Sequence, residues 1–375
     1  MLRSQPKPSR FLVILRLIVL LLIVGGLIAG GIWLFSPKGT SSVVAYRLPC
    51  DDNNSLRAFG NYVLYYDGKS IHCLSATGTV RWSFPIGANA GFDCTDKILA
   101  AWSGSTIYIL DQNGTSSYND NLGETIQFAR AGRQYVAAVV GETIQPRLIV
   151  KDHTGAHMDE ESDAYDDLII LDVNFYGKNG EYMWSLALDV FGLAANTILN
   201  TFEVGKMNTG EVSLGESITY DIIYESGQLR VIGTRNMKTF NYRGTENLAQ
   251  SALVYGWQLM DHEITERGEA LMLFAPTAQG AEKQADIRAL RVIGPNLDRR
   301  YTMPETSIGG AIWQRTLYAF SPTMLYRAGM LDSRFMTTEL PLERPITRLI
   351  DVTANGRAIV ACGDEVYTLT LPTTN

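Results

Sequence analysis

Two patterns of hydrophobic and polar residues divide this chain near residue 40. An unbroken apolar run of 19 residues extends from Leu17 to Phe35, and Phe11–Leu15 lengthens it backwards past one charge, Arg16. As a helix, the run would span roughly 28 Å, about the thickness of the hydrocarbon core of a bilayer. Beyond residue 40 the helical period disappears, and short β-branched and aromatic runs alternate with corners that contain Gly, Asn or Asp.

The apolar run predicts a transmembrane helix over residues 11–35. We expect Arg10, Arg16 and Trp33 to anchor this helix at the headgroups, because arginine snorkels to the membrane interface and tryptophan favours it. Basic residues precede and interrupt the run, and no acid occurs before Asp51. This charge order favours a cytoplasmic N-terminus and places the rest of the chain outside the cytoplasm.

These signals divide the chain into four parts. Residues 1–10 are a cytoplasmic basic tail, 11–35 an uncleaved signal-anchor helix, 36–41 a short tether and 42–371 an extracytoplasmic domain. The protein is therefore expected to be a single-pass protein of the cytoplasmic membrane. A cleaved signal peptide is the alternative. It has the same charge order, but its apolar core is only about 7–15 residues long.

The extracytoplasmic part contains repeated groups of short strands. In the first group, Tyr62–Tyr66, Ser70–Leu74 and Val80–Phe84 are joined by tight-turn signals, Asp67-Gly68 and Thr77-Gly78. Similar groups recur down to the C-terminus. Four-stranded antiparallel units of about 40 residues are typical of β-propellers. The sequence therefore predicts an all-β propeller.

The last group ends at Val366–Leu371, one strand short of four. The segment Ser42–Leu48 is β-rich and precedes the first group. We expect these two segments to pair, because the pairing closes the ring and removes two exposed strand edges. Counted in this way the propeller has eight blades. Seven is the alternative, if residues 205–305 hold one blade fewer.

One group resembles a repeat of the pyrroloquinoline-quinone-type (PQQ-like) propellers. Ala76, Gly78 and Trp82 match the alanine, glycine and following tryptophan that dock neighbouring blades in that family. Tyr118 and Asp159 stand where the next two tryptophans would be. Over residues 42–371 the chain is similar to a family of membrane-anchored PQQ-like propellers of unknown function.

The resemblance implies a fold and leaves the activity open. PQQ-like propellers include quinoprotein dehydrogenases and also non-catalytic scaffolds, such as the lipoprotein subunit of outer-membrane protein assembly, so the fold alone does not select a function. The quinoprotein subclass implies a vicinal disulfide and a calcium ion at the quinone. This chain has no adjacent cysteine pair. We therefore expect a protein that is not an enzyme, with no catalytic residues, cofactor or metal.

The charge of the exported part excludes one class of partner. Without the four basic residues of the anchor region, 28 Lys and Arg stand against 39 Asp and Glu, a net charge of about −11. Nucleic-acid binding is not expected, because it requires a basic stripe. The expected partners are membrane lipid, through the N-terminal helix, and envelope proteins.

Two clusters of acidic and histidine residues are candidate metal sites. Six acids lie between Asp159 and Asp167, and calcium binding stays open there. The segment lacks the glycine-centred spacing of a calcium loop, which favours a solvated connector. His153, His157 and Asp159 could be read as a metal site. They lie at a turn and at the start of a strand, where residues four apart do not face each other as they would on a helix, so a role without metal is favoured.

Other candidates are weaker still. Asp261, His262 and Glu263 should alternate between the two faces of a strand. Gly309-Gly310 precedes a predicted strand and favours a turn over a phosphate site. Four cysteines match no zinc spacing, and both buried thiols and disulfides remain open for them: Cys50, Cys73, Cys94 and Cys362. Five tryptophans on predicted strands favour blade packing over a stacking platform for sugars or peptides: Trp82, Trp102, Trp184, Trp257 and Trp313.

The sequence thus favours a non-enzymatic, membrane-anchored propeller that serves as a protein-interaction scaffold at the cell envelope. The alternative is a sensor or adhesion domain that binds a glycan or peptide. A degenerate quinoprotein oxidoreductase is the third hypothesis. The partner, the ligand and the oligomeric state are not written in the sequence.

Overall fold

The computed structural model describes residues 42–206, 208–215, 218–277 and 287–373. The tail, the transmembrane helix and the tether expected from the sequence, including Arg10, Arg16 and Trp33, lie outside the described residues. Among the residues that are described, no helix has the length and apolarity needed to cross a bilayer. Residues 42–371 form one compact unit.

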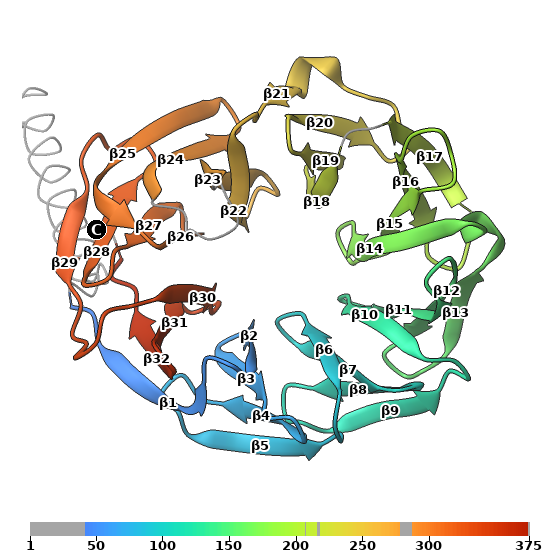
Figure 1. Cartoon of the computed structure of the whole chain (residues 1–375), viewed down its shortest axis with the longest axis horizontal. Helices are drawn as coiled ribbons and strands as arrows, with labels where there is room; N and C mark the ends of the chain where they lie inside the picture. Colours follow the sequence, from blue (N-terminus) through green and yellow to red (C-terminus); the bar gives the residue numbers. More distant parts are fainter. Residues whose placement is uncertain (1–41, 207, 216–217, 278–286, 374–375) are drawn as a thin grey trace, which may run out of the picture. The chain divides into compact units, whose positions relative to one another are not determined.

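Eight four-stranded antiparallel sheets are arranged around a ring (Figure 1). Blades 1 to 7 are β2–β5, β6–β9, β10–β13, β14–β17, β18–β21, β22–β25 and β26–β29, and blade 8 is β30–β32 with β1. An all-β, eight-bladed propeller is therefore confirmed, and the seven-bladed alternative is excluded. The strands nearest the centre of the ring are β2 (Ser55–Phe59), β6 (Gly91–Cys94), β10 (Ile126–Ala131), β14 (Leu168–Tyr176), β18 (Thr219–Glu225), β22 (Trp257–Ile264), β26 (Gly309–Trp313) and β30 (Arg348–Val352).

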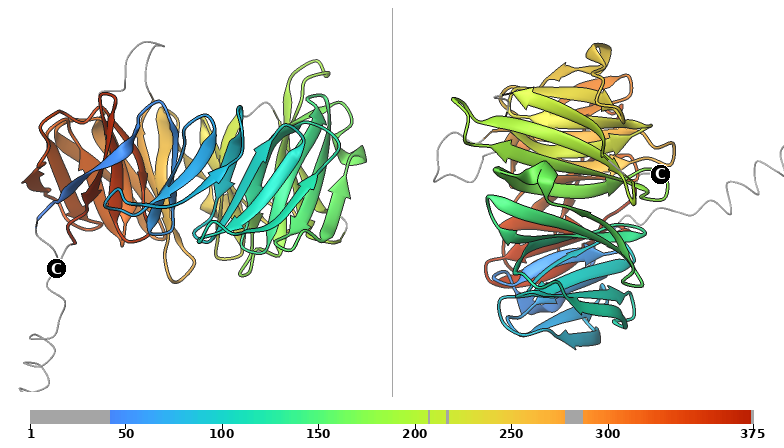
Figure 2. Two further views of the ribbon diagram at one scale, coloured as in Figure 1. Left: turned by 90° about the horizontal axis from the view of Figure 1, so that it is seen from below. Right: turned by 90° about the vertical axis from the view of Figure 1, so that its right-hand side faces the viewer.

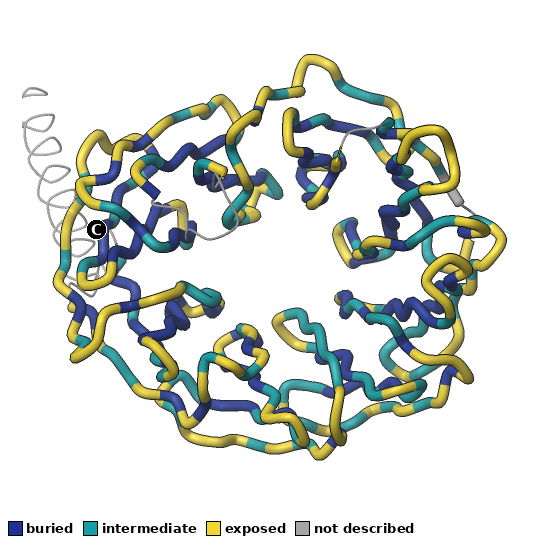
Figure 3. Tube along the Cα trace, in the orientation of Figure 1, coloured by how far each residue is buried: buried dark blue, intermediate teal, exposed yellow. Residues whose placement is uncertain are grey.

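The two middle strands of each blade carry most of the buried apolar residues. The second strands are β3 (Tyr62–Tyr66), β7 (Ile98–Ser103), β11 (Tyr135–Glu142), β15 (Tyr182–Asp189), β19 (Gln228–Gly233), β23 (Ala270–Pro276), β27 (Thr316–Phe320) and β31 (Arg357–Cys362). The third strands are β4 (Ser70–Leu74), β8 (Thr106–Asp111), β12 (Gln145–Asp152), β16 (Asn196–Glu203), β20 (Asn236–Asn241), β24 (Ile287–Gly294), β28 (Met324–Gly329) and β32 (Glu365–Thr370). These second and third strands are apolar on both sides, because a neighbouring blade covers each face of every sheet (Figure 3).

The outer strands are more polar and more variable in length. They are β5 (Val80–Pro85), β9 (Ser116–Asn121), β13 (His157–Glu161), β17 (Asn208–Gly215), β21 (Ala252–Leu253), β25 (Leu297–Ser307), β29 (Met336–Glu339) and β1 (Ala45–Asp51). Two short 3₁₀ helices, η1 (Asp163–Tyr165) and η2 (Leu248–Gln250), follow β13 and precede β21. The outer edge of blade 5 is the shortest of the eight.

The first strand of the described chain completes the last blade. β1 pairs antiparallel with β32, with Ala45 opposite Leu369 and Arg47 opposite Tyr367. An apolar cluster at the same joint connects blade 8 to blade 1, and it includes Leu48 and Ile359. Pairing and packing therefore both contribute to the closure of the ring.

The sequence did not identify three of the inner strands, β2, β6 and β10. Their polar residues, such as Asp93 in β6, interrupt the apolar pattern that marks a strand. Gly309-Gly310 was expected to form a turn but lies inside β26. A Cβ at Gly309 would lie 2.7 Å from the Cβ of Leu349 in β30, so glycine allows blade 7 to approach blade 8 closely.

Leu48→Ala should weaken the closure of the ring. Leu48 is 2% exposed and packs in the cluster between blades 8 and 1. Truncation of a buried leucine costs about 2–5 kcal/mol, so we expect a lower denaturant midpoint for the full-length chain in detergent. Val44→Ala is the control, because Val44 is 42% exposed and should cost less than about 0.5 kcal/mol. Equal midpoints for the two variants would contradict the packing argument.

Candidate interaction surface

The antiparallel topology gives the ring two distinct faces (Figure 2). Successive strands alternate in direction, so hairpins between first and second strands and between third and fourth strands share one face. In blade 8 no hairpin joins the third strand to the fourth. Instead β32 ends and β1 begins at that position. We call this the terminus-side face. The opposite, distal face carries the hairpins between second and third strands and the connectors between blades.

Trp82 lies at the joint between blades 1 and 2. Its indole Nε1 donates a hydrogen bond of 2.9 Å to the carbonyl of Gln112. A Cβ at Gly114, where φ is +76°, would lie 2.5 Å from the Trp82 ring. Gly78 similarly faces the carbonyl of Arg47 in β1, and the carbonyl of Ala76 accepts a hydrogen bond of 2.5 Å from the Thr368 hydroxyl. All three residues of the PQQ-like motif therefore contact a neighbouring blade.

An aromatic ring also packs against a glycine of the next blade at two other joints. Tyr118 covers Gly155 of the next blade, where a Cβ would lie 2.1 Å from the ring. Trp313 covers Gly356, and its Nε1 donates to the carbonyl of Ala354 at 3.2 Å. The other tryptophans also lie on strands: Trp102 on β7, Trp184 on β15 and Trp257 on β22.

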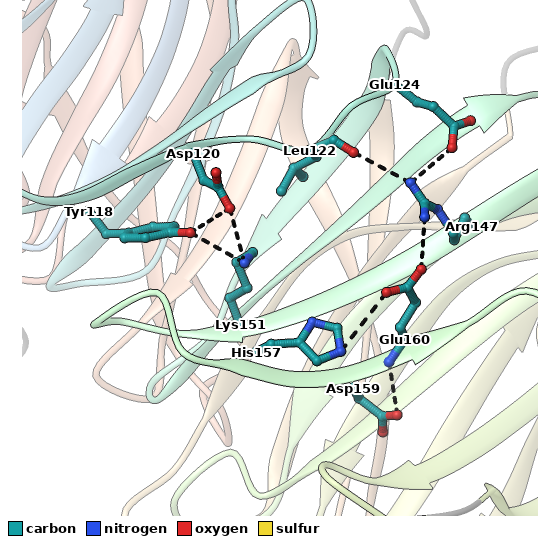
Figure 4. A network of polar contacts seen from close by, with 9 residues as sticks. All are labelled: Tyr118, Asp120, Leu122, Glu124, Arg147, Lys151, His157, Asp159 and Glu160. Atoms are coloured by element: carbon teal, nitrogen blue, oxygen red, sulfur yellow. Dashed lines mark hydrogen bonds and ion pairs between the residues drawn. The ribbon is translucent and has the colours of Figure 1, made fainter.

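A polar network joins the outer parts of blades 2 and 3 (Figure 4). The Lys151 ammonium lies 3.2 Å from the Asp120 carboxylate and 3.3 Å from the Tyr118 hydroxyl. Arg147 pairs with Glu124 and Glu160, each at 2.9 Å. These charges neutralise one another across the joint, so the network is an interblade contact.

The acidic segment Asp159–Asp167 is only in part a connector. Its first three acids belong to β13, and η1 follows. The side chain of Tyr165 is fully buried, and its hydroxyl donates to Ser185 Oγ at 2.7 Å. The remaining acids of this segment, Asp163, Asp166 and Asp167, are exposed. The segment expected to be a solvated connector is therefore a strand at its start and carries exposed acids beyond it.

The histidines considered as metal ligands do not converge. The imidazole Nε2 of His153 lies 3.2 Å from the carbonyl of Gly132. His157 Nε2 is 3.9 Å from a carboxylate oxygen of Glu160. Burial lowers the pKa of His153. Within the described residues there is no group of three His, Cys, Asp or Glu side chains placed to hold a metal ion.

Aspartates on the inner strands form interblade hydrogen bonds that the sequence did not predict. Asp93 accepts from the backbone N–H of Ala131 at 2.9 Å, Asp261 from Ile312 at 2.8 Å, and Asp351 from Ala58 at 2.8 Å. In each case the carboxylate belongs to one blade and the N–H to the next. Asp172 instead pairs with Arg130 at 2.9 Å. These carboxylates hold neighbouring inner strands together.

The protein environment shifts the protonation of these groups. Burial raises the pKa values of Asp93 and Asp172. Burial also raises the pKa of Asp261 to about 7, although hydrogen bonds from Ile312 and His262 oppose the shift. His262 is solvent-exposed, yet the surrounding protein lowers its pKa, and electrostatic attraction to Asp221 opposes this change. The Asp261 carboxylate accepts a hydrogen bond of 2.8 Å from the backbone N–H of His262.

The four thiols are unpaired in the structure. Burial raises the pKa of Cys50 and of Cys73 to about 12 and that of Cys362 to about 11. The pKa of Cys94 is also raised, chiefly by burial. These positions are typical of inert thiols in strands.

Two cavities adjoin the inner strands. One, of about 570 Å³, opens at the distal face over blades 8, 1 and 2, and its lining includes Arg57, Phe92, Trp102 and Arg348. The other, of about 480 Å³, lies between blades 5 and 6. There Glu225 is buried, is paired with Arg230, and accepts from the backbone N–H of Ala270 at 2.8 Å.

The distal loops of blades 3 to 5 expose large apolar side chains. Phe191 is 61% exposed and Leu193 is fully exposed in the hairpin between β15 and β16. Ile144 and Ile218 are exposed on the loops to either side. We call these four side chains the distal apolar patch. Large apolar side chains exposed on adjacent loops of one face can mark an interaction surface.

Comparisons with known proteins identify the fold. No protein-family model matches the chain, and no curated protein matches it in sequence. BamB from Moraxella catarrhalis is similar in structure over 89% of this chain and 99% of its own, with a TM-score of 0.54 and 7% identity. The Pan2 WD40 domain of Neurospora crassa is similar over 89% of this chain and 95% of its own, with a TM-score of 0.52 and 8% identity. Such low identities establish the β-propeller fold and no more.

Gly114→Ala should destabilise the protein more than Gly104→Ala. Both glycines have positive φ, so each substitution should cost about 1–2 kcal/mol. Only at Gly114 would the new methyl meet the Trp82 ring, whereas Gly104 has open space. We expect an additional loss of about 1–3 kcal/mol at Gly114, measured as the difference between the two denaturant midpoints. A larger loss at Gly104 would show that Trp82 does not need the close approach.

The pH dependence of stability should report on Asp261. Its pKa in the folded protein is about 7, against about 4 in the unfolded chain. The folded state therefore binds more protons between these values, so this group causes stability to fall as pH rises from about 4 to 7. Asp261→Asn should flatten the fall in thermal midpoint between pH 5 and 7.5. Asp96→Asn, at an exposed acid, is the control, and the same slope in both variants would refute the assignment.

Proposed function

We propose that this chain is a membrane-anchored, extracytoplasmic scaffold that binds proteins of the cell envelope. The apolar run at residues 17–35 and the basic residues before it support the anchor. A closed ring of eight blades offers two broad faces, and propeller faces are suited to partner binding.

The topology supports one orientation of the scaffold. Both ends of the ring lie on the terminus-side face, where β1 begins and β32 ends. A tether of six residues reaches no more than about 20 Å. In the proposed arrangement the terminus-side face is therefore held near the bilayer, and the distal face is directed towards the envelope.

The distal apolar patch is the observation that carries this proposal. Phe191 and Leu193 are 61% and 112% exposed and lie on the hairpin that joins β15 to β16. Large apolar side chains on a solvent-facing loop are costly to hydrate, and burial in an interface removes that cost. A partner that covers them accounts for their position.

A sensor that binds a small ligand is the second candidate. The cavity over blades 8, 1 and 2 has a volume of about 570 Å³, which is within the usual range for ligand sites. Phe92 and Trp102 provide aromatic walls and Arg57 provides positive charge, whereas Arg348 is paired with Asp52 of the same lining. An acidic peptide or a charged glycan would suit this lining.

A single reagent tests both the location and the partner. In intact cells, a membrane-impermeant maleimide that carries a photoreactive group should label Leu193→Cys and, after illumination, cross-link it to an envelope protein. Leu331→Cys is the matched control, because Leu331 is 82% exposed but belongs to a terminus-side hairpin. It should yield fewer protein cross-links. Labelling of Leu193→Cys only after lysis would refute the extracytoplasmic location, and labelling without a protein cross-link would refute the scaffold.

A further inference from the structure

We propose that the distal apolar patch docks a segment of a partner protein that combines basic and apolar side chains. The inference rests on the proposed scaffold function and specifies the chemistry of the partner. Two features carry it: the apolar side chains over blades 3 to 5 and the negative charge of the distal loops of blades 3 and 4.

The apolar side chains lie on neighbouring blades. Ile144 is at the distal hairpin of blade 3, Phe191 and Leu193 are at that of blade 4, and Ile218 is on the connector to blade 5. Their exposed fractions are 43%, 61%, 112% and 67%. A partner that reaches all four would follow the curve of the ring.

On blades 3 and 4 the loops around the patch are acidic and contain no base, whereas the distal hairpin of blade 5, which is hydrogen-bonded to Ile218, carries the exposed Arg235. The distal segments 122–125, 142–145, 161–167 and 189–195 have neither Lys nor Arg. Their acids are Glu124, Glu142, Glu161, Asp163, Asp166, Asp167 and Asp189. Of these, Glu124 is neutralised by Arg147 of β12. Burial raises the pKa of Glu161, and repulsion from Asp159 and Asp163 adds to the shift, as expected in a region of negative potential.

The surface is held in place before any partner binds. Tyr165, in the middle of the acidic segment, is fully buried and bonded to Ser185 of blade 4. In the neighbouring hairpin, the backbone N–H of Phe191 donates to the Asp189 carboxylate at 2.9 Å. Preformed loops lower the entropic cost of binding. Acidic loops thus adjoin exposed apolar anchors on blades 3 and 4, a combination of polar and apolar groups that occurs in protein interfaces.

The same features disfavour other occupants. An anionic lipid surface would be repelled by these acids. No three metal-ligating side chains converge within the described part of the chain. The acids instead contribute together to a negative electrostatic potential at the surface. A basic and apolar protein segment satisfies both the charge and the exposed side chains.

The test uses the full-length protein in nanodiscs of zwitterionic lipid and two fluorescent peptides of alternating sequence. One peptide contains Leu and Lys, and the other contains Leu and Glu. Fluorescence anisotropy, corrected with empty nanodiscs, should show binding of the basic peptide only. Raising the salt concentration from 50 to 500 mM should weaken this binding, because exposed charges are screened.

Two sets of variants locate the contact. Phe191→Ser with Leu193→Ser, and Asp163→Asn with Asp166→Asn and Asp167→Asn, should each weaken binding of the basic peptide by about tenfold or more, as expected for loss of interface anchors or of charge. The controls remove matched apolar groups or charges elsewhere: Leu331→Ser with Met336→Ser, and Asp96→Asn with Glu266→Gln and Glu339→Gln. They should change binding by less than about twofold. Circular dichroism verifies the fold of each variant.

The outcomes separate this inference from the scaffold itself. No binding to the wild-type protein, equal binding of both peptides, or equal effects of the distal and control variants would overturn it. If cross-links from residue 193 form in cells while the peptides fail, the scaffold stands and its partner has another chemistry. If the peptides bind as expected but no cross-links form in cells, the surface stands and the envelope scaffold fails.

Discussion

The structure depends on the closure of a ring by two strands from opposite ends of the described chain. β1 supplies the edge that β32 lacks, and the apolar cluster around Leu48 joins the same blades. A hydrogen bond between Ala58 and Asp351 adds a contact that spans 293 residues of sequence. Without this joint, blade 8 would have three strands, and β32 and β1 would each expose an unpaired edge. Each blade is flanked by two others only because the circle is complete.

The same interblade hydrogen bond recurs at several joints near the centre of the ring. A carboxylate on one inner strand accepts from a backbone N–H of the next blade, as Asp93 does from Ala131 and Asp261 does from Ile312. This arrangement satisfies N–H groups that no neighbouring strand of the same sheet can reach. Its cost is the desolvation of the carboxylates, which their raised pKa values express. The inner carboxylates therefore have a structural role between blades.

The sequence predicted the middle strands well and the inner strands poorly. Runs such as Tyr135–Val140 are apolar on both sides, so their pattern is evident locally. Gly91–Cys94 is short, and its aspartate has meaning only beside the next blade. Gly309-Gly310 resembled a turn because the closeness of Leu349 is not visible in sequence. The distal surface was also missed, since the acidic loop around Tyr165 and the hairpin at Leu193 meet only through the order of the blades.

Among the described residues, the strand that completes the ring is synthesised before all the other strands, and its partner β32 is synthesised after them. A chain made from its N-terminal end has to keep Ala45–Asp51 unpaired until residues up to Thr370 have emerged. Earlier blades can fold in the meantime, one behind another. A product truncated before Glu365 cannot complete the circle and retains open edges that invite aggregation or proteolysis. The position of β1 thus means that the ring can close only after β32 has been synthesised.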